Sequence, residues 1–297
     1  MVVAVVLTWN GREDTLACLA SLTEVPDGPE RVVVVDNDSS DGTAEAVAER
    51  FPDVELVRTG ANLGFAGGNN RGIERALALG ADHVLIVNND AEVEPGAIGA
   101  LVDAAGERPD AGSLGAKVLF ADPPGLVWFA GADYDPRRGY NGRQRGYREP
   151  DGPQFAGTRE TDRACGAAML VPRAVLERVG GFDEELFLYS EDVEWSLRAA
   201  EAGYRHFVVG DSVVRHHVSA SGGGESSPLT LYYGLRNSLV VCERHAPLGR
   251  LGTWRRRLVL LGAHLAQAVL APGRVAGVRA VAAGFRDGLA SRLGPRR

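Results

Sequence analysis

The sequence predicts an α/β fold in which a largely parallel sheet carries helices on both faces. Three observations lead to this prediction. Short runs rich in valine, leucine and isoleucine are apolar at every position, as expected of strands buried on both sides. Segments with the i, i+3, i+4, i+7 spacing of amphipathic helices alternate with these runs. Polar clusters stand where the runs end, which is where such sheets bind ligands.

Four strand–helix units make up the first third of the chain. The predicted strands are "VVAVVLT" (2–8), "RVVVVD" (31–36), "VELVR" (54–58) and "HVLIV" (83–87). The helices that follow them carry apolar stripes, which include Leu16, Leu19 and Leu22; Ala44, Val47, Ala48 and Phe51; Ile73, Ala76 and Leu77; and Ile98, Leu101, Val102 and Ala105. The polar clusters at the strand ends are "TWN" (8–10), "DNDSSDG" (36–42) and "NND" (88–90).

The second half of the chain is less regular. Residues 121–163 are rich in Pro, Gly, Arg and Tyr, and we expect a hairpin and a loop there. Further elements are predicted as a strand (165–172), a short helix from Pro172 to Gly180, a helix at 190–203 with Ser190 as N-cap, a strand (204–209), a helix from Pro228 to about His245, and helix in the tail. We therefore expect a sheet domain at 1–227 and a helical region at 228–297.

Composition excludes several classes of protein. The chain has 297 residues, 45% hydrophobic and 24% charged, as in ordinary soluble globular proteins. The N-terminus enters a strand directly, without the segments of an export signal, so we expect a cytoplasmic protein. Cys18, Cys165 and Cys242 are far apart and form no CxxC pair, which argues against a disulfide framework and a thiolate zinc site.

The net charge of −7 is unevenly distributed. From Arg250 onward there are ten arginines and one acidic residue, Asp287, so the rest of the chain is strongly acidic. An acidic body argues against nucleic-acid binding. The basic tail is expected to meet an anionic surface or to dock on the body. Its apolar run at 258–271 is too short to span a bilayer.

Two stretches in the first half favour a nucleotide site. "VVDNDSSDGT" places Asp36 at a strand end and Gly42 before a helix. A carboxylate there can accept hydrogen bonds from a base or ribose, although an ordinary capped turn explains the same pattern. "NLGFAGGNNRG" (62–72) combines glycines with asparagines, which suits close approach of backbone to a ligand or tight turns. Neither stretch is the GxGxxG motif of dinucleotide-binding folds.

The stretch "VLIVNND" raises the question of a metal. Asp90 follows a buried strand, with Asn88 two residues before it. Mg²⁺ or Mn²⁺ takes few protein carboxylates and completes its shell with water and substrate phosphates, so a lone Asp facing a bound nucleotide fits. Asn88 could bond to ribose or to a metal-bound water. Ordinary turn chemistry at a strand end is the alternative.

A second acidic centre lies in "YSEDVEW" (189–195). Glu191 and Asp192 fall in the first turn of a predicted helix, where the helix dipole stabilises negative charge. A carboxylate there can also serve as a general base. Trp195 is either a wall for a sugar or a buried aromatic residue. His216 and His217 open a Ser- and Gly-rich loop, where a histidine can ligate a metal or simply be solvated.

The order of these motifs resembles the inverting family 2 glycosyltransferases, whose GT-A fold is a Rossmann-like nucleotide-binding mixed sheet flanked by helices. The resemblance covers about residues 2–240. It rests on "TWN", "VVDNDSSDGT", "NLGFAGGNNRG", "VNND", "CGAAMLVPR" and "GGFDEELFLYSEDVEWSLR". The stretches "NLGFAGGNN" and "YYGLRNSL" (232–239) most resemble bacterial rhamnosyltransferase-like members.

The resemblance implies a donor site. Thr8, Asn10 and Asp36 match the family's nucleotide-base and ribose contacts, and Asn62 and Asn69 lie in its nucleotide-side loop. The implied donor is a nucleotide-diphosphate sugar, with dTDP-rhamnose favoured and UDP- or GDP-sugars as alternatives.

The resemblance also implies metal and catalytic residues. Asp90 matches the last carboxylate of the family's DxD metal motif, in which Asn88 replaces the usual first Asp. His216 matches a metal- or diphosphate-contacting histidine, with His217 as the alternative. Asp192 matches the base of the family's "ED" motif. The implied cofactor is Mg²⁺ or Mn²⁺.

The expected activity is transfer of a sugar to a glycan or lipid-linked acceptor in cell-envelope polysaccharide synthesis. Asp192, beside Glu191, would deprotonate the acceptor, and Gly166 and Ala167 would line the acceptor side. A non-catalytic nucleotide- or carbohydrate-binding module on the same fold is the alternative. We expect residues 250–297 to contact the inner face of an anionic membrane, although packing on the body or a contact within a homo-oligomer explains the same pattern.

Overall fold

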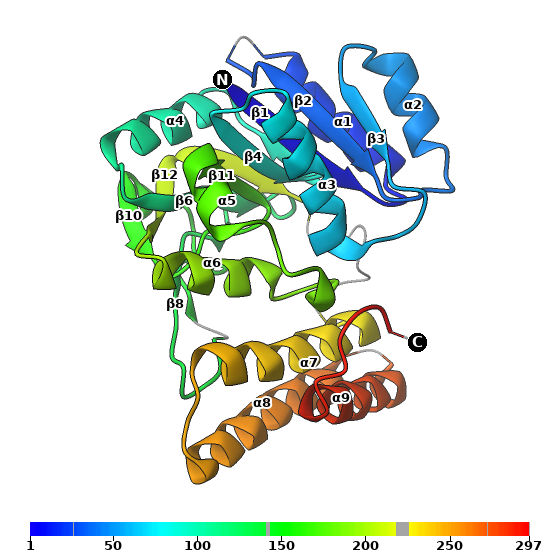
Figure 1. Ribbon diagram of the computed structural model, residues 1–297, viewed down its shortest axis with the longest axis vertical. Helices are drawn as coiled ribbons and strands as arrows, with labels where there is room; N and C mark the ends of the chain where they lie inside the picture. The colour runs from blue at the N-terminus through cyan, green and yellow to red at the C-terminus, as the bar shows by residue number, and fades with distance from the viewer. Residues whose placement is uncertain (26, 141–142, 218–225, 272, 297) are drawn as a thin grey trace.

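The fold is built on a mixed sheet with helices on both faces, as predicted (Figure 1). The computed structural model describes residues 1–25, 27–140, 143–217, 226–271 and 273–296. Its largest sheet runs in the order β10-β12-β6-β11-β4-β1-β2-β3, with β5 paired to β12 and β7 to β6.

The first four strands are parallel neighbours and confirm the predicted strand–helix units. They are β1 (Val2–Thr8), β2 (Arg31–Asp36), β3 (Glu55–Arg58) and β4 (His83–Asn88). Alternate residues of β1 point to opposite faces. Val2 and Val6 pack with α1 (Arg12–Thr23), α2 (Thr43–Arg50) and α4 (Ala97–Glu107). Val3 and Val5 pack with α3 (Gly64–Ala78), α5 (Arg173–Val179) and α6 (Glu191–Glu201).

Two of the four glycines in "NLGFAGGNNRG", Gly68 and Gly72, pack α3 against the sheet, whereas Gly64 has a positive φ of 73° at the start of the helix. A Cβ on Gly68 would lie 2.3 Å from Cδ1 of Leu7, and one on Gly72 would lie 2.2 Å from Cγ1 of Val5. Neither glycine has positive φ, so the need is for space rather than for backbone freedom. Gly68 and Gly72 therefore serve neither of the two roles considered for this stretch, which were close approach to a ligand and tight turns.

The other half of the sheet is where sequence reasoning was incomplete. The central strand β6 (Ala111–Phe120) is buried along all its length, and its sequence had suggested no element. β11 (Ala168–Pro172) lies antiparallel between β4 and β6, and β12 (Arg205–His216) runs parallel to β6. The predicted strand at 204–209 was therefore too short, since β12 continues to His216 and carries it to the site.

Residues 121–163 contain the expected hairpin, formed by β8 (Ala132–Asp133) and β9 (Arg143–Gln144). They also supply β7 (Val127–Phe129) and β10 (Thr158–Thr161), which join the main sheet. Ser190 precedes α6 as predicted, but it has φ of 71° and its side chain makes no capping hydrogen bond, so the predicted N-cap was wrong in its chemistry.

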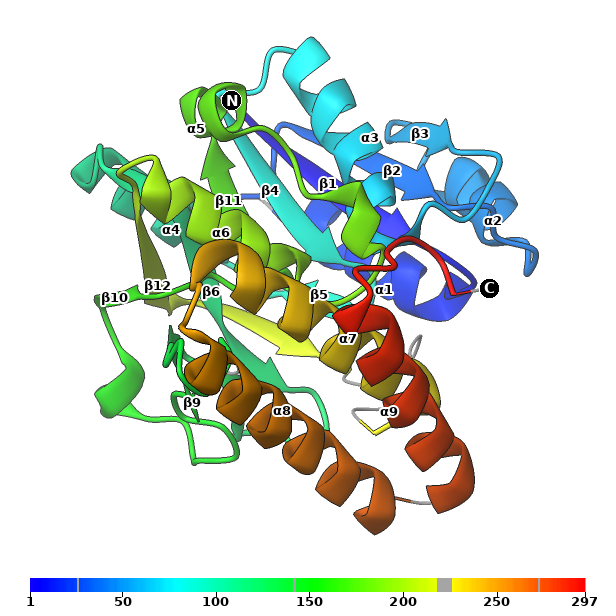
Figure 2. The ribbon, with the colours of Figure 1, turned by 60° about the horizontal axis from the view of Figure 1, so that its bottom comes forward.

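The predicted C-terminal helices are α7 (Pro228–His245), α8 (Arg250–Leu270) and α9 (Arg274–Leu289), which form a layer beside the sheet domain (Figures 1 and 2). α9 approaches α7 closely at Gly284. A Cβ at this position would lie only 2.5 Å from the carbonyl oxygen of Tyr232, so the contact requires a glycine. The layer is tied to the body by Arg244, which pairs with Asp183 at 2.6 Å. In the described part of the chain, no helix combines the length and apolar character needed to cross a membrane.

Candidate active site

The candidate site forms where β1, β2 and β4 end together. The register aligns Thr8 of β1 with Asp36 of β2, and Leu7 of β1 with Asn88 of β4. Three polar clusters that are far apart in the sequence therefore meet at one edge of the sheet. This is the edge at which parallel α/β sheets bind ligands.

Amide side chains join the loops in which the donor residues were predicted. Oδ1 of Asn10 accepts a hydrogen bond from the Ser40 backbone N–H at 2.8 Å. Nδ2 of Asn37 donates to Oδ1 of Asn62 at 3.1 Å, and the same Asn62 oxygen accepts from Gly64 N–H at 2.9 Å. Asn37, which sequence reasoning did not single out, therefore fixes the predicted nucleotide loop.

Four of the predicted donor residues, Thr8, Asn10, Asp36 and Asn69, are not part of the cavity wall, and all of them except Asn10 are buried. Thr8 is buried, and its hydroxyl bonds to the hydroxyl of Thr15 at 2.8 Å. Asn69 is fully buried on α3 and donates to the Phe65 carbonyl at 3.0 Å. Asp36 is also buried, and its Oδ1 accepts from Ser39 N–H at 3.3 Å. Thr8 and Asn69 thus support the site from below, whereas Asn62 lines it.

Asp90 and His216 are brought together by strand pairing. β5 (Ala91–Val93) begins directly after Asp90 and pairs antiparallel with the end of β12, which sets Ala91 opposite His216. Nε2–H of His216 donates to Oδ1 of Asp90 at 2.9 Å, and both side chains are buried. The Trp128 ring meets the imidazole edge-on at 4.8 Å and holds it in place. His217 instead pairs with Glu92 on the surface, so His216 is the histidine at the site.

The surroundings of this pair suit a metal that takes most of its ligands from substrate and water. Oδ1 of Asn88 and Nδ1 of His216 are buried and have no hydrogen-bond partner among the described residues. Such atoms are costly unless a ligand or water satisfies them. The described residues contain no cluster of three or more His, Cys, Asp or Glu placed to hold a metal. Asp90, with His216 beside it, matches the few protein ligands typical of Mg²⁺ and Mn²⁺.

The second acidic centre lies after a strained turn. Phe187, Tyr189 and Ser190 all have positive φ, of 65°, 66° and 71°. Non-glycine residues adopt this conformation at a cost of about 1–3 kcal/mol each, and such strain persists only where surrounding contacts enforce it. The turn delivers Glu191 and Asp192 to the first turn of α6, facing the cavity.

α7 supplies the contacts that enforce this turn. The Asn237 amide is fully buried and donates to the carbonyls of Leu186, Leu188 and Tyr189 at 3.0, 2.9 and 2.6 Å. Arg236, also buried, donates to the Leu186 carbonyl at 2.8 Å. Both residues belong to "YYGLRNSL", where a polar pair interrupts an apolar helix. We call Arg236 and Asn237 the α7 clamp.

Asp192 and Glu191 have different environments. Nη1 of Arg163 donates to Oδ2 of Asp192 at 2.7 Å, so this carboxylate is paired and oriented. The Arg163 guanidinium also lies over the Phe129 ring at 4.9 Å. Glu191 is buried, and one of its oxygens has no hydrogen-bond partner in the described structure. Burial, reinforced by the neighbouring Asp192 charge, raises the pKa of Glu191 well above its usual range.

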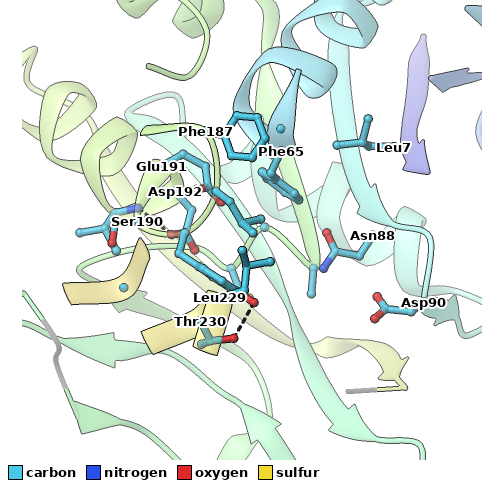
Figure 3. Close-up of a pocket in the computed structure, with 18 of the residues that line it drawn as sticks. Leu7, Phe65, Asn88, Asp90, Phe187, Ser190, Glu191, Asp192, Leu229 and Thr230 are labelled. Carbon is cyan, nitrogen blue, oxygen red and sulfur yellow. Dashed lines mark hydrogen bonds between the residues drawn. The ribbon is translucent and has the colours of Figure 1, made fainter. Parts of the chain in front are cut away.

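One cavity of about 610 Å³ joins the two acidic centres. In Figure 3, Asn88 and Asp90 lie to one side, and Glu191 and Asp192 lie across from them. Gly166 and Ala167, which were predicted to line the acceptor side, lie in the wall of this cavity. Trp195 does not, because it is 1% exposed in the core and its indole N–H donates to the Gly180 carbonyl at 2.8 Å, so its predicted role as a sugar-facing wall was wrong.

The C-terminal layer completes the cavity wall with side chains that the sequence did not reveal. His264 and Gln267 of α8 line the cavity together with Leu229 and Ser238 of α7. Nδ1–H of His264 donates to the Leu260 carbonyl at 2.9 Å, and burial lowers the pKa of His264. The ring is therefore neutral, and its Nε2 is a hydrogen-bond acceptor.

A polar sheet edge that shares one cavity with a second acidic centre fits the predicted GT-A glycosyltransferase. Residues 2–231 match the family described as Glycosyltransferase like family 2, and the chain belongs to that family. The protein is therefore an enzyme, as predicted, and its family and fold confirm the resemblance read from the motifs.

Two curated relatives are rhamnosyltransferases. The chain is 33% identical over 264 residues to N-acetylglucosaminyl-diphospho-decaprenol L-rhamnosyltransferase of Mycobacterium tuberculosis, covering 81% of this chain and 82% of that protein. It is 27% identical over 258 residues to dTDP-rhamnosyl transferase RfbF of Shigella flexneri, covering 82% and 81%. The fold also matches the mannosyltransferase PcManGT from Pyrobaculum calidifontis in complex with GDP-Man and Mn²⁺, with a TM-score of 0.58, 20% identity and coverage of 98% and 75%.

Proposed function

We propose that this enzyme transfers L-rhamnose from dTDP-rhamnose to a hydroxyl of a sugar that is linked through diphosphate to a polyprenol. The observation that carries the proposal is the single cavity with the Asp90–His216 pair on one side and Asp192 on the other. The names of the Mycobacterium and Shigella relatives support the choice of donor, and that of the Mycobacterium relative supports the choice of acceptor. The reaction belongs to the cytoplasmic face of a membrane, where a soluble nucleotide sugar meets a lipid-linked acceptor.

On the donor side, the nucleoside would lie against the loops joined by Asn37 and Asn62, beside Asp36. Asp90 and His216 would hold Mg²⁺ or Mn²⁺ next to the diphosphate, in the sparse coordination that these ions accept. A bound divalent ion neutralises charge that develops on the leaving diphosphate. The Mn²⁺ in the complex of the archaeal mannosyltransferase supports this proposal.

On the acceptor side, Asp192 would take the proton of the attacking hydroxyl. Its ion pair with Arg163 fixes the orientation of the carboxylate, which faces the cavity and can act there as a base. Glu191, whose pKa is raised by burial, holds its own proton and adds no second charge beside Asp192. Attack from the side opposite the diphosphate would invert the anomeric centre.

The donor half of the proposal is tested by calorimetric titration with dTDP, UDP and GDP, each with and without Mg²⁺ or Mn²⁺. We expect tight, metal-dependent binding of dTDP to the native protein and its loss in Asp90→Ala. Glu92→Ala is the matched control, since Glu92 pairs with the exposed His217 and lies outside the cavity wall. Tight binding of UDP or GDP instead of dTDP would contradict the proposed donor nucleotide. Equal metal-dependent binding of dTDP by native protein and by Asp90→Ala would show that Asp90 is not part of the donor site.

A further inference from the structure

Exposed apolar side chains are concentrated on the two last helices. Among the large hydrophobic residues that are exposed in the described structure, most lie on α8 and α9: Leu251, Trp254, Leu258, Val259, Val269, Leu270, Val275 and Val278. Leu251 and Leu270 are each 86% exposed. Scattered exposed leucines are normal, but a continuous patch marks an interaction surface. We call the surface formed by these eight residues the outer face.

α8 has two opposite apolar sides. Leu260, His264 and Ala268 are buried toward α7, and His264 also lines the active-site cavity. Leu251, Trp254 and Leu258 follow the i, i+3, i+7 spacing on the opposite side, which no described element covers. Figures 1 and 2 show α8 and α9 side by side, on the side of α7 away from the sheet. The helix therefore has the cavity on one side and the outer face on the other.

Basic side chains accompany the outer face. Four arginines on the same two helices are exposed to solvent: Arg250, Arg255, Arg274 and Arg279. None of these four forms an ion pair within the described part of the chain, whereas Arg257, which points toward α7, pairs with Glu243. An exposed apolar strip with unpaired arginines and hardly any acid fits an anionic surface with a hydrocarbon interior.

We propose that the outer face docks on the surface of an anionic phospholipid bilayer, with α8 lying in the plane of the interface. Apolar side chains would enter the headgroup and acyl boundary while the arginines contact lipid phosphates. α8 is about 10–12 Å across with its side chains, so the acceptor side of the cavity would lie one helix thickness from the lipid. The acceptor's polyprenol could then stay in the bilayer while its sugar enters beside His264.

The docking itself stands on the outer face alone, but the placing of the acceptor rests on the proposed function. A second copy of this chain is the other occupant that an apolar face could take. The unpaired arginines favour the lipid, because a symmetric contact between two such faces would bring like charges together without acidic partners.

The test is cosedimentation of the full chain with phosphatidylcholine vesicles, with and without phosphatidylglycerol. We expect binding to the anionic vesicles only. Arg255→Gln with Arg279→Gln should weaken it by about 25-fold, since each basic residue near an anionic surface contributes about fivefold. Arg31→Gln with Arg159→Gln, which removes the same charge from exposed positions elsewhere, should leave binding unchanged.

A second set of variants separates apolar from electrostatic docking. Leu251→Gln with Leu258→Gln should abolish most vesicle binding, whereas Leu251→Met with Leu258→Met should keep it. All three residue types have similar helix propensity, and the exposed positions bear no core packing, so each variant should fold. Equal vesicle binding by the Leu→Gln and Leu→Met double variants would overturn the proposal. It would also be overturned if the native protein were a dimer that the Leu→Gln double variant dissociates.

Transfer assays separate this inference from the proposed function. We expect the variant with Leu251→Gln and Leu258→Gln to lose transfer to an acceptor embedded in anionic vesicles. The same variant should keep native rates with a short-chain, water-soluble acceptor. Native rates with both acceptors would refute the docking and leave the enzyme's activity intact. Absence of transfer by the native protein to either acceptor would refute the proposed function and leave vesicle binding to be judged on its own.

Discussion

The proposed donor side and the proposed acceptor side of the cavity are built in different ways. The donor side is formed by residues that directly follow β1, β2 and β4, and its amides bond to loops next to it. The acceptor side is assembled from distant segments, with Asp192 held by Arg163 and its turn held by the α7 clamp. The comparison teaches that one half of this enzyme is specified by short motifs and the other by tertiary packing.

The largest expected effect is on the acceptor side. Asp192→Asn keeps the size of the side chain but removes the base, so kcat should fall by about 10²–10⁴-fold. Donor binding, measured by titration with dTDP and metal, should stay close to native. The proposed donor side is formed at the ends of strands, whereas Asp192 lies on α6. Retained turnover in this variant would assign the base to another residue.

The next effect tests the α7 clamp. Asn237→Ala leaves the carbonyls of Leu188 and Tyr189 without their side-chain donor, whereas the Leu186 carbonyl keeps its hydrogen bond from Arg236. An unsatisfied buried group costs about 1–3 kcal/mol. We expect kcat to fall by more than the change in donor affinity, because the turn positions Asp192. Ser113→Ala is the control, since it removes a buried hydroxyl that bonds to Nδ1 of His206 at 2.7 Å and lies outside the cavity wall. Similar kinetics in the two variants would make Asn237 merely structural.

The smallest effect concerns stability as a function of pH. Glu191 has a raised pKa in the folded state, so the folded protein holds this proton while the unfolded chain has lost it. The stability from the proton is full below the unfolded value of 4.5 and is lost as pH rises toward the folded pKa. Glu191→Gln should therefore melt at a higher temperature relative to native protein as pH increases, by about 2–4 °C per kcal/mol. A melting difference that does not change with pH would contradict the assignment.

The same contrast explains how far the sequence could lead. The position of Asp90 and Asp36 at one edge of the sheet was predictable, because each stands at the end of a continuous apolar strand and such strand ends converge. The strand β6 was not predictable in this way. Its sequence, "AGSLGAKVLF", contains two glycines, a serine and a lysine, and the lysine is buried only through its ion pair with Asp151. Arg163, Asn237 and His264 act through contacts with segments remote in the sequence, for which no local pattern exists. Trp195 and Asn69 belong to motifs that indicated the site, but both side chains are buried in the core and do not reach the cavity.

The central claim is that donor and acceptor meet across the cavity from opposite sides. It is tested most directly by proton NMR of the product formed from dTDP-rhamnose and a diphosphate-linked acceptor, with the anomeric configuration compared with that of the donor. Attack by an acceptor activated at Asp192, opposite the diphosphate at Asp90 and His216, predicts an inverted configuration. Retention of the donor's configuration would contradict that arrangement.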